Sequence, residues 1–192
     1  MKKILLLNAN PKSSSFAKLL ADSYEVEARE KAEVRRMNLS EMEFNLSLDT
    51  GYDSEQPLEP SLDAFQQAIT WADHIVVISP IWWGGIPAKF KGLLDRSILP
   101  GFAFKYEKGS AEPAQLLTGK TVRLILTMDA PEEYLEYQAK PVLDQLDLFT
   151  FQFSGMSPAK VNLFGSIIGS DEAQRQQWLT EVAELGASES VK

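Results

Sequence analysis

The chain of 192 residues contains no cysteine and only one histidine, His74. Without cysteine it has no disulfide, no thiolate nucleophile and no cysteine-ligated metal cluster. A single histidine excludes a histidine-rich metal centre and leaves a serine nucleophile only one candidate base. We therefore expect no metal site, and we expect His74, which opens an apolar run, to be structural or solvent-facing.

Basic residues and long hydrophobic runs are also scarce. Nineteen Lys and Arg stand against 27 Asp and Glu, for a formal net charge of −8. A surface of this kind does not attract nucleic acid or anionic membranes, so a bound anion must be held by local geometry. No stretch approaches the roughly 18 apolar residues of a membrane span, and the apolar residues 4–7 are too few for a signal peptide. We expect a cytoplasmic protein with no membrane insertion and no nucleic-acid partner.

The sequence does contain a short apolar, β-branched-rich run that recurs along the chain. The runs centre on Ile4, Val34, Val76, Leu124 and Val161. Runs that are apolar on both faces are typical of parallel strands covered on both sides. Apolar residues at i, i+3 and i+4 spacings predict intervening helices, in segments 16–24, 62–69, 90–98, 143–149 and 178–182. This alternation predicts a single α/β domain over residues 1–192, with a long polar surface loop at residues 41–60.

Ligands in parallel sheets lie beyond the carboxyl ends of the strands, so the loops that follow strands are the candidate binding loops. The first reads "NANPKSSSFAKLL" (residues 8–20) and places three serines before a helix. Hydroxyls beside the free N–H groups of a helix N-terminus suit a phosphate or carboxylate; the alternative is a serine that only caps the helix. The glycine-rich fingerprints of nicotinamide Rossmann domains and of phosphate-loop nucleotide hydrolases are both absent.

The second loop lies in "SPIWWGGIPAKFKGLLDR" (residues 79–96). Gly84 and the glycine after it allow a ligand close to the backbone, and Trp82 and Trp83 offer flat apolar surfaces. The alternative is that both indoles are anchors of the core or of a dimer interface. The third loop, "TMDAPEEYLEY" (residues 127–137), offers a hydroxyl from Tyr134; the alternative is a polar loop whose tyrosine merely packs.

Together these loops resemble those of the flavodoxin-like NAD(P)H:quinone oxidoreductases, the group that includes DT-diaphorase and modulator of drug activity B. The longest shared signature is "ADHIVVISPIWWGGIPAKFKGLLDRSILPGFAFKY". The first loop is similar to the family's phosphate loop and the third to its last flavin loop, so the resemblance covers essentially the whole chain. It implies a flavodoxin-like three-layer sandwich, in which helices cover both faces of a five-stranded parallel sheet of order 2-1-3-4-5.

The resemblance also implies a non-covalent flavin, FAD or FMN, with NAD(P)H as the electron donor. The first loop would hold the phosphate, the second the isoalloxazine and the third its pyrimidine end. The implied cofactor-binding residues are Asn10, Ser13, Ser15, Phe16, Ala17, Pro80, Ile81, Trp82, Trp83, Gly84, Thr127, Met128 and Asp129. Asn10 and Ala17 replace a usual histidine and asparagine, and Gly84 replaces a phenylalanine of one relative, which leaves a roomier acceptor pocket.

The implied activity is two-electron, ping-pong hydride transfer from NAD(P)H through the flavin to a quinone or similar small electrophile. Tyr134 is the implied catalytic hydroxyl, and the histidine that accompanies it in relatives is missing. A homodimer is also implied, in which Phe102, Phe104 and Tyr106 of "GFAFKY" reach the partner subunit's substrate pocket. Two alternatives remain: a flavin-binding regulatory subunit of a membrane ion-efflux system, and a flavodoxin-type electron carrier.

Overall fold

The computed structural model describes residues 1–110 and 112–191. Its main sheet is parallel and contains β1 (Lys2–Asn8), β2 (Ala32–Asn38), β3 (His74–Pro80), β6 (Thr121–Thr127) and β7 (Lys160–Phe164). The strand order is β2-β1-β3-β6-β7, which is 2-1-3-4-5 when the strands of this sheet alone are counted. The predicted sheet and its order are confirmed.

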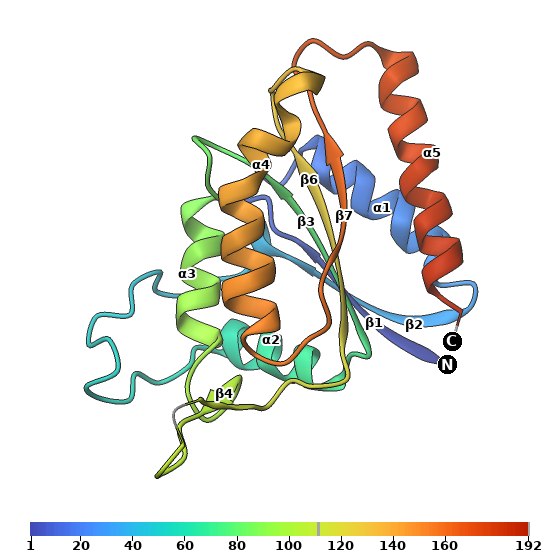
Figure 1. The fold of residues 1–192 in the computed structure, drawn as a ribbon. Coiled ribbons are helices and arrows are strands. Elements are labelled where there is room, and N and C mark those ends of the chain that lie inside the picture. The colour runs from blue at the N-terminus through green and yellow to red at the C-terminus, as the bar shows by residue number, and fades with distance from the viewer. Residues whose placement is uncertain (111, 192) are drawn as a thin grey trace.

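Helices cover both faces of the sheet (Figure 1). One face packs against α1 (Phe16–Ala28) and α5 (Glu172–Glu189), and the other against α2 (Pro60–Trp71), α3 (Ala88–Ser97) and α4 (Leu135–Leu143). Strand β1 shows why the central part of an inner strand is apolar: Leu5 and Leu7 enter one core, while Ile4 and Leu6 enter the other. Successive side chains of a strand point to opposite faces, so the part of a strand that is covered on both faces is filled with apolar residues.

Two parts of the predicted helical pattern are wrong. The i, i+3 and i+4 spacing predicts that Leu19 and Phe149 lie on the buried faces of segments 16–24 and 143–149, but they are 51% and 69% exposed. Beyond α4 the chain winds as a π-helix, η3 (Asp144–Gln152), in which the Thr150 hydroxyl donates to the carbonyl of Gln145, five residues earlier, at 2.7 Å. This wider winding carries a side chain to a different face from the one that an α-helical period predicts.

The predicted surface loop at residues 41–60 begins at a short 3-10 turn, η1 (Leu39–Glu41), and ends at α2. Its base is held by Arg96 of α3, which is fully buried. The Arg96 guanidinium donates to the carbonyls of Asn45 and Pro57, each at 2.8 Å, and to the Glu59 carboxylate at 2.9 Å. Sequence reasoning missed this anchor, since an arginine in an amphipathic helix is ordinarily exposed.

A buried polar cluster joins the end of α5 to the amino end of the sheet; its members Tyr24, His74, Arg123 and Glu189 form the Glu189 cluster. The Glu189 carboxylate accepts from Arg123 Nε at 2.8 Å and from the Tyr24 hydroxyl at 3.2 Å, and it lies 3.2 Å from His74 Nε2. Burial favours the neutral carboxyl, but the hydrogen bonds from His74 and Arg123 outweigh it and lower the pKa of Glu189 to about 2. His74 is therefore structural, and the solvent-facing alternative is wrong.

A small antiparallel hairpin, β4 (Phe104–Lys105) with β5 (Ala114–Gln115), follows α3 and was not predicted. Strands of two residues are too short to show an alternating pattern. None of the helices in the described part of the chain has the length and apolar character that a membrane crossing requires.

Candidate functional site

The three predicted loops leave the sheet side by side at its carboxyl edge. The N–H of Ala9, just after β1, donates to the carbonyl of Ile78 in β3 at 2.8 Å. The N–H of Ile81, just after β3, donates to the carbonyl of Thr127 at the end of β6, also at 2.8 Å. The strand order reverses between β1 and β3, and such a switch point is where open α/β sheets bind ligands.

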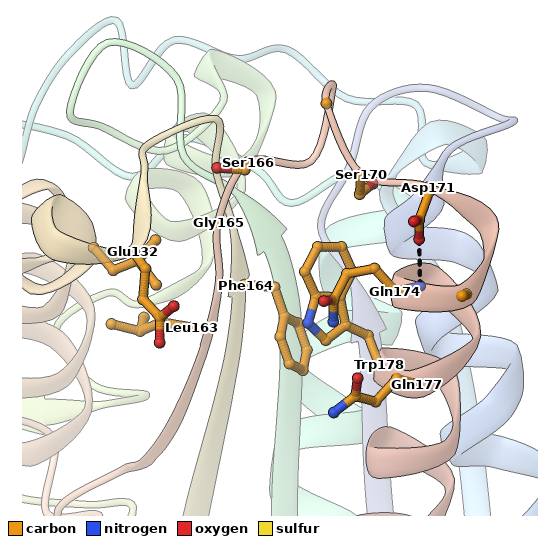
Figure 2. A pocket seen from close by; sticks show the side chains of 13 residues that line it. Glu132, Leu163, Phe164, Gly165, Ser166, Ser170, Asp171, Gln174, Gln177 and Trp178 are labelled. Atoms are coloured by element: carbon orange, nitrogen blue, oxygen red, sulfur yellow. Dashed lines mark hydrogen bonds between the residues drawn. The ribbon is translucent and has the colours of Figure 1, made fainter.

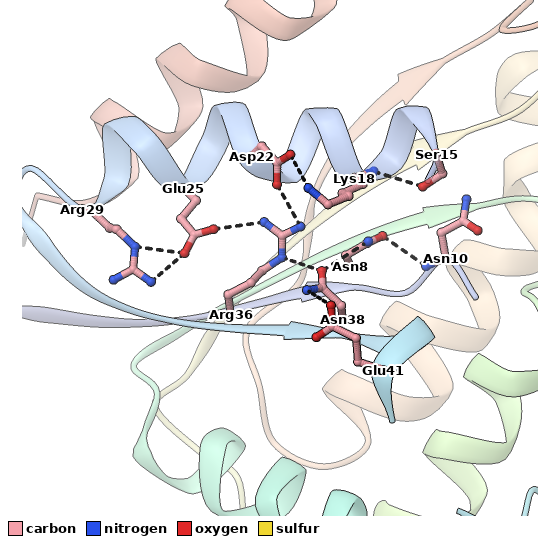
Figure 3. A network of polar contacts seen from close by, with 10 residues as sticks. All are labelled: Asn8, Asn10, Ser15, Lys18, Asp22, Glu25, Arg29, Arg36, Asn38 and Glu41. Atoms are coloured by element: carbon pink, nitrogen blue, oxygen red, sulfur yellow. Dashed lines mark hydrogen bonds and ion pairs between the residues drawn. The ribbon is translucent and has the colours of Figure 1, made fainter. Parts of the chain in front are cut away.

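The first loop is shaped by asparagine side chains that bind its own backbone. Asn8 Oδ1 accepts the N–H of Asn10 at 3.3 Å, and Asn10 Oδ1 accepts the N–H of Lys12 at 3.0 Å. Ser15 is the N-cap of α1, and its hydroxyl accepts the N–H of Lys18 at 3.2 Å (Figure 3). The capping alternative therefore holds for Ser15. Ser13 is exposed, and its side chain makes no hydrogen bond among the described residues.

The positive field of this loop comes from the backbone more than from side chains. The N–H groups of Phe16 and Ala17, in the first turn of α1, have no intrahelical acceptor. Two of the nearby cations are paired: Lys18 binds Asp22 at 2.7 Å, and Arg36 binds Glu25 at 3.1 Å (Figure 3). An anion at this loop is thus served largely by amides and hydroxyls, with Arg175 of α5 at the side of the loop.

The second loop is a tight two-residue turn. Trp82 and Gly85 exchange both backbone hydrogen bonds at 2.9 Å, and the central residues Trp83 and Gly84 have φ of 55° and 68°, as in a type I′ turn. Trp82 is 44% exposed and Trp83 105% exposed. The core-anchor alternative is therefore wrong for both indoles, while the interface alternative stays open. A methyl group on Gly84 would meet nothing within 4 Å, so the space above the turn is open.

The third loop turns its acidic residue away from the other two. Thr127 and Met128 are buried, and the N–H of Met128 donates to the carbonyl of Phe164 at 2.9 Å. Asp129 Oδ1 accepts the N–H of Ile168, in the loop after β7, at 3.0 Å. Tyr134 ends a 3-10 turn, η2 (Glu132–Tyr134), and is 54% exposed. The Asp129 carboxylate is therefore already occupied by a backbone N–H of another loop.

The three aromatic residues assigned to a substrate pocket lie at the opposite edge of the sheet. Phe102 borders a groove with Thr70, at the end of α2, and Lys120, just before β6. Phe104 is 7% exposed, and its ring centroid lies 5.1 Å from that of Phe153. The expectation of an exposed aromatic cluster is wrong for Phe104, because the β4–β5 hairpin folds this ring against η3; Tyr106 is 67% exposed.

Three grooves of the described residues surround the carboxyl edge. The sequence did not indicate that α4 and α5 form walls of these grooves. The largest, about 790 Å³, lies beside β7 between Glu132 and α5 (Figure 2). Among the described residues, its walls carry Glu132, Asp171, Gln174 and Gln177 but no lysine or arginine, so its chemistry does not suit a phosphate. The other two grooves lie at the first and second loops.

Comparisons with known proteins agree with this architecture. Residues 2–185 match the profile of a family described as flavodoxin-like fold. An uncharacterized NAD(P)H oxidoreductase of Haemophilus influenzae is 30% identical over 187 residues, 94% of this chain and 92% of that protein. An FMN-dependent NADH:quinone oxidoreductase of Methylobacterium radiotolerans is 29% identical over 59% of this chain and 55% of that protein. The crystal structure of Smu.1420 from Streptococcus mutans UA159 has a TM-score of 0.81 at 25% identity and covers 97% of this chain and 99% of that one.

Proposed function

Because the chain belongs to the flavodoxin-like fold family, and because three loops form one site at the switch point of its sheet, we propose that it is a flavin-dependent NAD(P)H oxidoreductase. It would transfer two electrons, by ping-pong hydride transfer, to a quinone or similar small electrophile. The observation that carries the proposal is the turn at Trp83, which is open to solvent and whose indole packs into neither core of the domain. The names of the relatives from H. influenzae and M. radiotolerans support it.

The residues of the site fit a flavin. Phosphate would be held by the hydroxyls of Ser13 and Ser15 and by the N–H groups of Phe16 and Ala17, with Asn10 keeping the loop in shape. The flat ring would lie along the open backbone of the second loop, from Pro80 to Gly84, with its polar end towards residues 127–129. When bound, a flavin supplies the two-electron chemistry, and the protein supplies orientation and electrostatics.

Tyr134 is the residue that we expect to favour negative charge at the polar end of the ring. Its hydroxyl can donate a hydrogen bond, and the Asp129 carboxylate is held away by the N–H of Ile168. We expect Tyr134→Phe to slow reduction by NADH about tenfold. Loss of one such donor slows catalysis roughly 100-fold or more at enclosed sites, and the effect is smaller here because Tyr134 is half exposed. Rapid mixing under anaerobic conditions measures this rate. Tyr52→Phe, in the surface loop, is the control, and equal rates in both variants would remove the role of Tyr134.

The visible spectrum of the purified protein tests the function most directly. We expect a yellow protein whose released chromophore is identified by mass spectrometry and whose holoprotein reduces quinones with NADH or NADPH. A colourless protein that takes up neither FMN nor FAD would refute the proposal. A yellow protein that oxidises NAD(P)H no faster than free flavin would favour the regulatory-subunit alternative, and a stable one-electron state during titration would favour the electron carrier.

A groove beside the first loop has room for the additional phosphate and adenine of FAD, while the relative from M. radiotolerans is named as FMN-dependent. Its volume is about 620 Å³, and it is lined by the serines of the loop and by Arg175 and Leu179 of α5. Arg175 lies 5.9 Å from the centre of the Phe16 ring and donates to the Ser170 hydroxyl at 2.9 Å. A second phosphate and an adenine would have a cation and an apolar wall there.

We therefore expect Arg175→Gln to weaken FAD binding about tenfold, because one charge-assisted contact is lost, and to leave FMN binding within about twofold. Titration of the flavin-free protein with each flavin measures both affinities, and Arg175→Lys, which keeps the charge, is the control. Equal losses for the two flavins would show that Arg175 only supports the loop.

The homodimer is a further part of the proposal, and it rests on the position of the remaining aromatic residues. Phe102 and Tyr106 lie at the amino edge of the sheet, away from the loops of their own chain, so they would contribute to a flavin site only through a second copy. Aromatic residues are enriched in the cores of protein interfaces. Size-exclusion chromatography with light scattering is expected to give twice the chain mass, and a monomer at micromolar concentration would contradict this arrangement.

A further inference from the structure

The turn at Trp83 holds a large side chain in an unfavourable backbone conformation without burying it. A residue with a Cβ at positive φ is strained, and such strain is found mostly where function requires it. Trp83 has φ of 55° and an indole that is 105% exposed. No aromatic pair among the described residues includes Trp83, whereas the rings of Phe164 and Trp178, in the groove beside β7, lie against one another at 5.5 Å. The turn itself requires this positive φ, but the indole that it carries is left exposed and without an aromatic partner among the described residues.

Across a groove from Trp83 stands α4, with the first residue of η3 after it. The groove has a volume of about 670 Å³ and is lined by Trp83, Gly84, Tyr137, Gln138, Lys140, Pro141 and Asp144. Small-molecule sites are typically cavities of this size with a mostly apolar lining. Tyr137 is 80% exposed, so its ring, like the indole, is not committed to the core.

The charges of the groove cancel. Lys140 and Asp144 form an ion pair at 2.7 Å, and no other charged residue lines the groove. The position next to Trp83 is Gly84, which puts no side chain into the space. The groove thus offers two uncommitted aromatic rings and no net charge, which suits a flat, neutral, apolar ligand of more than one ring.

We propose that Trp83 and Tyr137 form an aromatic clamp for neutral, planar electron acceptors with two or more fused rings, and that Tyr137 is a specificity-determining residue. The inference rests on the proposed oxidoreductase function and names the acceptor class of that site. The clamp acts on binding of the acceptor: ring stacking favours a two-ring acceptor over a one-ring acceptor because it covers more of each aromatic face.

The test compares 1,4-naphthoquinone with 1,4-benzoquinone as acceptors for the flavin-loaded protein at saturating NADH. We expect Tyr137→Ala to raise KM for naphthoquinone about tenfold while kcat stays within about twofold, and to change KM for benzoquinone by less than about twofold. Tyr137→Phe keeps the ring and should restore the wild-type KM. Tyr52→Ala removes a tyrosine of similar exposure, 71% against 80%, from the surface loop and should change neither KM.

Binding provides a readout that does not depend on turnover. We expect calorimetry with 2-naphthol, which accepts no electrons here, to show an affinity about tenfold weaker for Tyr137→Ala than for the wild type. Equal KM changes for both quinones, or unchanged 2-naphthol affinity, would overturn the clamp. Loss of flavin from Tyr137→Ala would also overturn it, because the groove would then belong to the cofactor. A wild-type protein that reduces no acceptor but binds 2-naphthol through Tyr137 would refute the oxidoreductase function alone.

Discussion

Replacement of Glu189 by glutamine is expected to destabilise the fold by about 3 kcal/mol, since removal of one partner from a buried ion pair leaves an uncompensated charge. Arg123 and Glu189 have side chains only 9% and 8% exposed, and their charged atoms approach to 2.7 Å. Glutamine cannot balance the Arg123 guanidinium. For a chain of this length the loss corresponds to a fall in Tm of roughly 10 °C, which thermal unfolding followed by circular dichroism measures.

The matched control is Glu184→Gln, which removes a carboxylate from an exposed position of the same helix and should change stability by less than about 0.5 kcal/mol. The double variant Arg123→Met with Glu189→Leu should recover much of the loss, because it removes both charges together. A Glu189→Gln variant as stable as Glu184→Gln would show that the cluster contributes little to the fold.

The same carboxylate makes stability depend on acid pH. The pKa of Glu189 is about 2 in the folded protein against an ordinary value of 4.5. A lowered pKa means that the contribution is complete above pH 4.5 and is lost as pH falls towards 2, by about 3 kcal/mol in total. Urea titrations across this interval should therefore show a steeper fall in unfolding free energy for the wild type than for Glu189→Gln. Parallel curves would contradict the prediction.

Replacement of Ser13 by aspartate is expected to weaken FMN binding on the order of 100-fold, because a carboxylate beside the phosphate adds a repulsion of about 3 kcal/mol. Ser13 is exposed, so the fold should be unaffected. Amides and hydroxyls carry much of the attraction for an anion at this loop, since Lys18 is already paired with Asp22. Fluorescence titration of the flavin-free protein with FMN measures the change.

Two comparisons isolate the electrostatic cause. Riboflavin, which has no phosphate, should bind the wild type and Ser13→Asp equally, and Ser13→Asn, which is of similar size but neutral, should bind FMN within about threefold of the wild type. Ser54→Asp places the same charge on the surface loop and should have no effect. An equal loss of riboflavin affinity would show that Ser13→Asp disturbs binding of the ring. It would contradict the assignment of the phosphate to the first loop.

Local patterns in the sequence were sufficient to predict the strands and the three loops that follow them. Strand β3 is buried at every residue, and residues 75–78 are all apolar because they serve two cores in alternation, which is visible in a window of a few letters. The positions of the loops then follow from the rule that parallel strands end at one edge. The types of residue in these loops, such as the hydroxyls before α1 and the glycines after Trp83, can also be recognised from adjacent positions in the sequence.

Contacts between distant segments decided the rest. His74 and Glu189 are 115 residues apart and meet only because α5 returns to the amino end of the sheet; Arg96 likewise depends on carbonyls 39 and 51 residues away. The groove walls at Arg175 and Tyr137 and the burial of Phe104 likewise depend on contacts between segments that are far apart in the sequence. Periodicity describes one element at a time, whereas burial of a charge or assembly of a groove depends on which other element lies opposite, and that is set by packing.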